Sequence, residues 1–468
     1  MTPRRRFLGI FCLALAAYAF STHDRPFAAG NDLSRWAQIE ALVDYRSGTI
    51  ERSRFAATVD RLEAGGHVYS NKPPFLAIVG AGLYAPLEAA TGWRLGDRRT
   101  SAAAVWVLTL LLVGAPAALG VALFDRLLAR FPGLSPGGRL LCDLALAGGT
   151  LVGSYAGTLN NHVPAAALLI AAGAAVLADR PAIAGAACGF AAAVDLLPGL
   201  GMTPFFAWML VAGRGRIRTR WLRFAVGLTP GLAAALLSDL LVTGTLLPPK
   251  LLPGAVDLSV RAGASVAGVL LPESRLYPLE VLGGWHGLFL VSPVLVVGAL
   301  GLWRAATRPP FASPWLWRAL GIGIVAQIVG HALLAGSYGG WAFGFRYLIP
   351  VQPLLLFGAP VVLAADWGRK LFALLLPPSL LFAAIGAYNP WPPAYEQRTG
   401  GDAVASLVHD PIAGNAAAWC CEHWPGSRLC QGVGERFIAA DPGMRRRYLE
   451  LFFASKGDVE ALEALERR

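Results

Sequence analysis

The sequence predicts an all-α, polytopic membrane protein with about eleven transmembrane helices. Of its 468 residues, 55% are hydrophobic and only 15% are charged, whereas a soluble chain carries about 25% charge. The mean hydropathy of +0.53 supports the same class. Arginines gather in a few of the short loops between apolar segments, a pattern that sets orientation in membrane proteins. The net charge of +11 therefore indicates topology, and we expect no nucleic-acid partner.

Twelve apolar segments are candidates for crossing the bilayer, because a spanning helix needs about 20 mostly apolar residues. They are 7–22, 74–90, 101–124, 140–159, 163–178, 183–198, 200–213, 222–242, 287–303, 319–336, 347–365 and 371–388. The first follows Arg4, Arg5 and Arg6 and has no clear cleavage site after it, so we expect an uncleaved helix and not a removed signal peptide.

Basic loops at 214–223, 304–318 and 369–370 fix the cytoplasmic side, which the N-terminus shares. The outer side then receives 21–73, 243–286, 337–346 and 389–468. An N-terminus inside and a tail outside require an odd number of crossings, so one of the twelve segments should not cross. We expect this one to be 74–90, which begins with a proline, as an interfacial or partly inserted helix.

The chain thus divides into a transmembrane domain, 1–388, and an extracytoplasmic tail, 389–468. The transmembrane domain includes the first outer loop, 21–73. Within that loop, 33–45 has one apolar helical face, which predicts an interfacial helix lying on the membrane.

Three cysteines, Cys420, Cys421 and Cys430, lie in the outer tail. In an oxidising compartment their spacing allows one disulfide and one spare thiol. A metal site that includes His423 is the alternative for these thiols.

Asp32 and Arg35 are the first candidate site residues, one helical turn apart at the start of the helix predicted in the first outer loop. A carboxylate there can act as a general base, and a guanidinium beside it can bind an anion. The structural alternative is that Asn31 or Asp32 caps the helix and Arg35 pairs at the surface. Asn31 is also a candidate contact to substrate or metal.

Lys72 lies in the motif Asn71-Lys72-Pro73-Pro74, in a chain that has four lysines in all. The rigid Pro-Pro turn can fix an ammonium group on the outer surface, where it would hold a phosphate. The alternative is a lysine that snorkels to the interface while the prolines start the next helix. Asn71 is a further candidate contact.

Asn161 and His162 lie between two apolar segments, and His286 lies where another segment enters from the outer side. Polar groups at membrane depth need partners or water, so these three are candidate contacts to a substrate or a metal. Structural roles, as a helix cap or an interfacial histidine, remain open for them. Arg346 follows a run of aromatic residues and glycines, 337–345, and a cation at a helix entrance suits an anionic lipid.

These residues resemble motifs of the GT-C superfamily of integral-membrane glycosyltransferases, close to the bacterial protein-mannosyltransferase and aminoarabinose-transferase branch. Members carry an acidic residue in the first outer loop, often with an arginine three residues on, and then a Lys-Pro-Pro motif. Asp32-Leu33-Ser34-Arg35 and Lys72-Pro73-Pro74 match in order and rough spacing. Relatives often have a second acidic residue where this chain has Asn31 and Asn71, so the need for a divalent metal is left open.

The resemblance implies a glycosyltransferase that takes a sugar from a polyprenyl-phosphate donor. Asp32 would deprotonate the acceptor, and attack at the anomeric carbon would invert its configuration. Arg35, Lys72 and Arg346 would stabilise the departing lipid phosphate. The acceptor would be a glycan, a lipid or a protein outside a bacterial inner membrane. No nucleotide cofactor is expected, because neither a Walker A motif nor a dinucleotide fingerprint occurs.

A multi-pass lipid or glycolipid transporter, or flippase, is the alternative function. It would show paired half-repeats and charged residues at mid-membrane. Asp195 and Asp239 are the candidates for such charges, and both lie near the ends of apolar segments.

Overall fold

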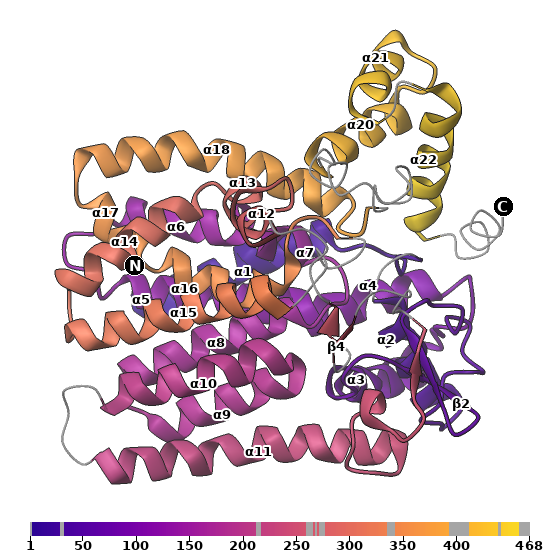
Figure 1. Ribbon diagram of the computed structural model, residues 1–468, viewed down its shortest axis with the longest axis horizontal. Helices are drawn as coiled ribbons and strands as arrows, with labels where there is room; N and C mark the ends of the chain where they lie inside the picture. Colours follow the sequence, from indigo (N-terminus) through magenta and orange to yellow (C-terminus); the bar gives the residue numbers. More distant parts are fainter. Residues whose placement is uncertain are drawn as a thin grey trace.

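The computed structural model describes residues 2–28, 32–211, 217–258, 265–266, 269–270, 277–334, 342–392, 411–438 and 441–457. Long helices lie side by side in one bundle, and smaller elements gather at one end of it (Figure 1). The longer bundle elements are α1 (Pro3–Ser21), α4 (Ser101–Thr109), η1 (Leu110–Gly114), α5 (Ala115–Leu128), α6 (Pro136–Gly148), α8 (His162–Leu177), α9 (Pro181–Val194), α10 (Leu196–Val211), α11 (Ile217–Thr243), α14 (Leu295–Thr307), α15 (Pro314–Leu334) and α18 (Asp366–Tyr388). The shorter helices between them are α7 (Leu151–Tyr155), η2 (Pro249–Leu251), α12 (Tyr277–Gly283), α13 (Leu288–Val291), η3 (Arg346–Val351), α16 (Gln352–Leu356) and α17 (Ala359–Leu363).

Each of the twelve predicted apolar segments coincides with a helix or with a run of helices. By length and composition, four helices of the described chain can cross a membrane, or up to five if one bent pair counts as a span. The four are Ser101–Leu128, Ile217–Thr243, Pro314–Leu333 and Asp366–Tyr388. A multi-pass architecture is therefore clear, while the number of eleven crossings stays a prediction.

Several of the predicted spans are broken. The segment 140–159 divides into α6 and α7 at Gly149, and 347–365 is a run of η3, α16 and α17 with internal prolines that donate no backbone hydrogen bond. The segment 287–303 bends beside Pro293, where α12 and α13 meet α14 at 104°. Hydropathy does not reveal these breaks, because the apolar composition continues through them.

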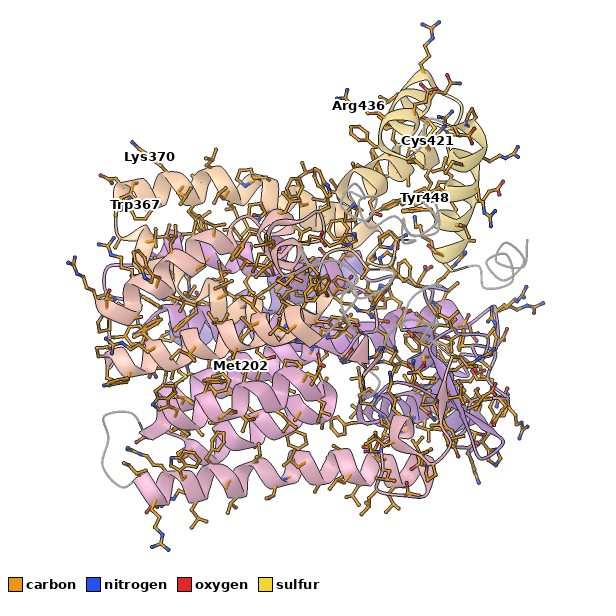
Figure 2. All side chains as sticks on the ribbon, in the orientation of Figure 1. Met202, Trp367, Lys370, Cys421, Arg436 and Tyr448 are labelled. Carbon is orange, nitrogen blue, oxygen red and sulfur yellow. A yellow bond between two sulfur atoms is a disulfide. The ribbon has the colours of Figure 1, made fainter. Side chains whose placement is uncertain are left out.

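The two ends of the bundle differ in character. In Figure 1, α10 ends and α11 begins at the left, and Figure 2 shows Lys370 at that same end. The elements of the first outer loop lie at the opposite, right-hand end (Figure 1). The bundle thus lies between these two basic regions and the first outer loop, and which end faces the cytoplasm stays a prediction.

A small sheet at the right-hand end corrects the expectation of a purely α-helical chain. Strands β1 (Arg61–Ala64) and β2 (His67–Ser70) form an antiparallel hairpin, and β3 (Val256–Asp257) pairs with the other edge of β1. The hairpin turn consists of Gly65 and Gly66, whose φ angles of +58° and +78° suit glycine. The hairpin places the Lys-Pro-Pro motif directly after β2.

Helices α2 (Leu33–Asp44) and α3 (Phe75–Thr91) lie beside this sheet (Figure 1). The first nine residues of α2 are all buried, so the predicted helix lying on the membrane is an internal helix instead. Polar side chains of its supposedly exposed face are bonded inside the protein. Gln38, for example, donates to the Gly48 carbonyl at 3.0 Å. Whether α3 crosses the membrane stays a prediction.

The described part of the tail consists of α20 (Pro411–His423), α21 (Arg428–Phe437) and α22 (Pro442–Ser455). A disulfide joins Cys421 to Cys430 and leaves Cys420 as a buried thiol, so one disulfide and one spare thiol are present as predicted. The tail packs on the end of α18, where the Tyr388 hydroxyl donates to Glu422.

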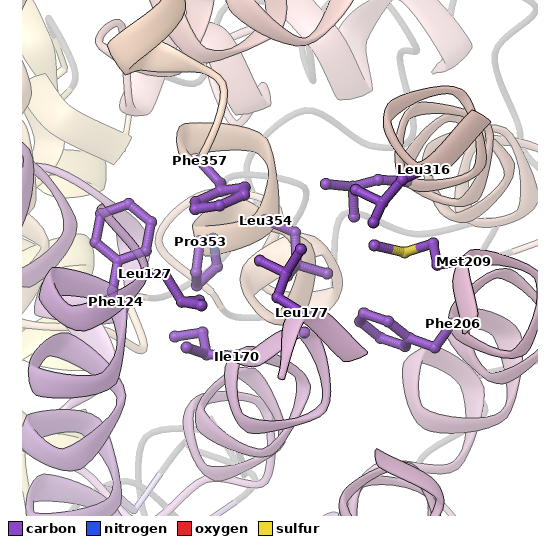
Figure 3. Close-up of a pocket in the computed structure, with 12 residues that line it drawn as sticks. Phe124, Leu127, Ile170, Leu177, Phe206, Met209, Leu316, Pro353, Leu354 and Phe357 are labelled. Atoms are coloured by element: carbon purple, nitrogen blue, oxygen red, sulfur yellow. The ribbon is translucent and has the colours of Figure 1, made fainter. Parts of the chain in front are cut away.

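An apolar cavity lies inside the bundle (Figure 3). Side chains of α5, α8, α10, α15 and α16 line it, together with Phe357. Its lining contains no titratable group, so it offers no acid–base chemistry.

Candidate functional site

Asp32 stands at the N-cap position of α2, but its side chain does not cap the helix. Its Oδ2 atom instead accepts a hydrogen bond from the backbone N–H of Phe27 at 3.3 Å and one from the Thr158 hydroxyl at 3.1 Å. Among the described residues, Oδ1 has no hydrogen-bond partner although it is buried. The capping alternative is therefore right about the position of Asp32 and wrong about its carboxyl group, which does not cap the helix.

The surroundings of Asp32 set its proton affinity. The residue is 1% exposed, and burial raises the pKa of its carboxyl group to about 7. The hydrogen bonds from Phe27 and Thr158, the charge of Arg35 and the nearby backbone N–H of Leu33 each lower the pKa by less than burial raises it. Arg35 favours the ionised form of Asp32, but burial outweighs the arginine. A pKa near 7 is the value that suits a general base at neutral pH.

Arg35 lies one turn along α2 and is almost fully buried. Its Nη2 atom donates to Oδ1 of Asn161 at 2.6 Å, so the predicted contact residue Asn161 positions Arg35. Burial and the nearby Arg346 guanidinium lower the pKa of Arg35 to about 10. The group stays charged at neutral pH.

Lys72 is held in the protein and does not snorkel into water. Its Nζ atom lies 2.9 Å from Oδ2 of Asp60, and both side chains are largely buried. The Ser34 hydroxyl ties α2 to this region, since it donates to the Asp60 carbonyl at 2.6 Å and lies 2.7 Å from the Ser70 hydroxyl. The position of Lys72 is therefore set jointly by the β1–β2 hairpin and α2.

Arg346 begins η3 and is 7% exposed. Its guanidinium carbon lies 4.9 Å from the centre of the Trp391 ring and 5.3 Å from that of Tyr347. Across the described chain, no carboxylate forms a salt bridge with it. The aromatic faces thus hold a buried cation whose charge is available to an anion.

The buried His162 pairs with Asp195, which is partly buried. His162 Nδ1 lies 2.6 Å from Oδ2 of Asp195, and the His162 ring packs edge-on against Tyr347 at 5.7 Å between centroids. His331 stacks on the Tyr347 ring, at 5.7 Å between centroids. Asp195, one of the two residues considered for a transporter, therefore hydrogen-bonds a predicted contact residue, His162.

Two other predicted contact residues have partners elsewhere in the protein, and a third lies outside the described residues. The Asn71 amide donates to Asp257 at 3.1 Å and so ties the motif to β3. His286 hydrogen-bonds the backbone of Ala342. Asn31 lies outside the residues that the structure describes.

Three cations share one electrostatic environment at this end of the bundle. The charge of Arg346 lowers the pKa of Arg35, and the charges of both arginines lower the pKa of Lys72. Burial is the largest cause of the lowering to about 8 for Lys72, and Asp60 opposes it. A site of this kind can bind an anionic group next to a carboxyl group that can take a proton.

Several residues of the site had no assigned role in the sequence. Thr158 and Trp391 contact the Asp32 group, and neither was among the predicted site residues. Asp60 was one of several acids in a loop of mixed charge. No local signal identifies these contacts, because Trp391 and Thr158 are 233 positions apart.

A metal site is not built into the described residues, since no three His, Cys, Asp or Glu side chains come together there in a way that could hold an ion.

No protein-family model matches this chain, and no curated protein matches it. Among solved structures, it is similar to ArnT from Cupriavidus metallidurans bound to undecaprenyl phosphate, with a TM-score of 0.51 and 17% identity over 96% of this chain and 77% of that one. The apo state of the same protein gives 0.50 and 18%, over 96% and 76%. At this identity the similarity establishes the fold, which is GT-C-like.

Proposed function

We propose that this GT-C-like chain is a membrane glycosyltransferase that moves a sugar from a polyprenyl-phosphate donor to an extracytoplasmic acceptor, with inversion. The acceptor would be a glycan, a lipid or a protein. The structurally similar ArnT binds undecaprenyl phosphate, which supports a donor of the same lipid class. We place the chain in a bacterial inner membrane, with its N-terminus in the cytoplasm and its site and tail outside.

The observation that carries the proposal is the combination of Asp32 with Arg35 and Arg346. A buried carboxyl group with a pKa near 7 lies one turn from one guanidinium, and a second guanidinium has aromatic neighbours but no salt bridge in the described chain. A lipid phosphate would supply the missing negative charge. Leaving a buried cation unpaired is costly, so its retention supports a role in binding.

The proposed reaction is a single displacement. Asp32 takes the proton of the acceptor hydroxyl, and the acceptor oxygen bonds to the anomeric carbon on the face opposite the phosphate. The bond from that carbon to the phosphate oxygen breaks, and its electron pair leaves on the polyprenyl phosphate. Arg35, Lys72 and Arg346 stabilise the charge that develops there.

The test compares envelope glycans, lipids and glycoproteins by mass spectrometry in cells with wild-type protein, with no protein and with an equal amount of Asp32→Asn. A sugar-sized mass that requires both the protein and Asp32 supports the proposal. A mass that Asp32→Asn still produces would favour the transporter alternative, and identical profiles in all three strains would contradict the proposal.

A further inference from the structure

Trp391 connects the start of the tail to the candidate base. Its ring is fully buried and packs edge-on against Tyr155, at 5.2 Å between centroids. Its backbone N–H donates to the Asn389 side chain at 2.9 Å, and the Tyr155 hydroxyl donates to the Pro390 carbonyl at 2.8 Å. The orientation of the indole is thus fixed by packing and by the bonds of its neighbours.

A directed chain of hydrogen bonds begins at this indole. The Trp391 Nε1 atom lies 3.1 Å from the Thr158 hydroxyl oxygen, and that oxygen lies 3.1 Å from Oδ2 of Asp32. An indole N–H can only donate, so the Thr158 oxygen accepts from it. The single hydrogen of the hydroxyl is then available for Asp32. Trp391 and Thr158 therefore act on the carboxyl group as a donor.

The two oxygens of Asp32 consequently differ. Oδ2 accepts from both Thr158 and the Phe27 amide, whereas Oδ1 is buried and accepts no hydrogen bond among the described residues. A proton on Oδ2 would compete with two donors. A proton on Oδ1 would leave both donors in place on a C=O group.

We infer that Trp391 and Thr158 orient the carboxyl group of Asp32 so that Oδ1 is the atom that takes the proton of the acceptor. That the proton comes from an acceptor rests on the proposed function, whereas the orientation of the Asp32 carboxyl group is a property of the protein without substrate. In the step, the proton moves from the acceptor oxygen to Oδ1, and Oδ2 keeps its two donors. Trp391 and Thr158 are positioning residues, since they act through Asp32.

The charged groups near the hydrogen-bond chain from Trp391 through Thr158 to Asp32 are not members of that chain. Arg35 acts on Asp32 from the same helix, and Arg346 lies over the ring of Trp391. Asp60 and Asp195 act on Arg35, where their negative charges favour the protonated guanidinium. None of these is altered in the variants below, and Trp391→Phe keeps an aromatic face for Arg346.

The test is an infrared pH titration of the full chain in detergent, with Asp32→Asn as the reference that identifies the Asp32 bands. Thr158→Val removes the hydroxyl at nearly constant shape. Its Asp32 midpoint should rise by about one pH unit, because a hydrogen bond to the charged form is lost. The carbonyl band of the protonated acid should move to higher frequency, because C=Oδ2 loses a donor.

Further variants separate this relay from a general structural effect. Thr158→Ser should keep the wild-type midpoint, Trp391→Phe should raise it by less than Thr158→Val, and the double variant should match Thr158→Val alone. Trp367→Phe, the same change at the other end of the bundle (Figure 2), should leave it unmoved. If Thr158→Val fails to fold, Trp391→Phe carries the test.

An Asp32 midpoint and band that neither Thr158→Val nor Trp391→Phe moves would overturn the inference. So would a wild-type carbonyl band already at the frequency of an unbonded C=O, because the proton would then be on Oδ2. These outcomes are independent of catalysis. Sugar transfer by Asp32→Asn would contradict the proposed function and leave the infrared result to be judged separately.

Discussion

The ammonium group of Lys72 lies 2.9 Å from a carboxylate oxygen of Asp60, and each side chain is less than one fifth exposed. Lys72 therefore already has an anionic partner in the protein. Removal of one member of a buried ion pair leaves the other charge uncompensated, whereas replacement of both members by neutral groups is often tolerated. This difference separates a structural role of Lys72 from a binding role.

Lys72→Ala should lower the free energy of unfolding by about 3 kcal/mol, because Asp60 is left unpaired. The double variant Lys72→Met/Asp60→Asn should recover most of this loss, as measured by thermal unfolding in detergent. Both variants should bind undecaprenyl phosphate much more weakly than wild type, and Lys72→Arg should keep part of the affinity. Wild-type affinity in the stable double variant would leave Lys72 as a structural partner of Asp60.

Arg346→Gln should show the opposite balance. Arg346 forms no salt bridge with a carboxylate in the described chain, so its removal strands no negative charge and relieves a desolvated cation. Stability should stay equal or rise, while affinity for undecaprenyl phosphate falls on the order of tenfold or more. Arg346→Lys, which keeps the charge but not the planar stacking group, should be intermediate. A destabilised Arg346→Gln protein with unchanged affinity would contradict this.

The sequence predicted the parts of the site that lie in local motifs. Asp32 and Arg35 are one turn apart on a helix, and Lys72 is followed by two prolines that fix the chain after it. Asn161 and His162 were chosen because a polar pair between apolar segments needs partners, and their partners are Arg35 and Asp195. Each of these predictions used residues that are neighbours along the chain.

The rest depended on contacts between distant segments. Trp391 meets Thr158 across 233 positions, and His162 meets Asp195 across 33. The pattern of 33–45 looked amphipathic because its polar side chains find partners inside the protein instead of water, and periodicity does not distinguish the two. The effect of burial on Asp32 was missed for the same reason: the sequence shows its neighbour Arg35 but not the depth at which both lie.

The rate of sugar transfer should depend on pH as a narrow bell. Asp32 must be deprotonated to act as a base, so kcat/KM should fall as the pH drops through about 7. Lys72 must be protonated to hold a phosphate, so kcat/KM should also fall as the pH rises through about 8. Lys72→Arg should extend the alkaline side, because a guanidinium keeps its proton there. An alkaline limit that does not move in this variant would assign it to another group.

The tail should lie outside the cytoplasm, where its disulfide can persist. In a variant that keeps only Cys421 and Cys430, a maleimide–polyethylene glycol reagent should modify the protein from cells only after reduction. After fusion behind Arg468, a reporter that works only when exported should be active, and a reporter that works only in the cytoplasm should be inactive. Cytoplasmic reporter activity would overturn the predicted odd number of crossings, and free thiols before reduction would contradict the disulfide.

Asp32→Asn is the central test of the site. The asparagine oxygen can still accept from Thr158 and Phe27, and no side-chain cap is lost because Asp32 makes none. Protein level and thermal stability should therefore stay near wild type. If Asp32 takes the proton of the acceptor, turnover should fall by about 10²–10⁴-fold.

The matched control for this variant is Asp44→Asn, which makes the same change at the last residue of the same helix. Asp44 accepts a hydrogen bond from the Tyr84 hydroxyl at 3.4 Å and has no contact with the Asp32 group among the described residues. Its substitution should leave turnover near wild type. Equal losses in both variants would indicate a general effect on α2. Wild-type turnover in Asp32→Asn would exclude Asp32 as the base and make Asp60, the partner of Lys72, the next carboxylate to test.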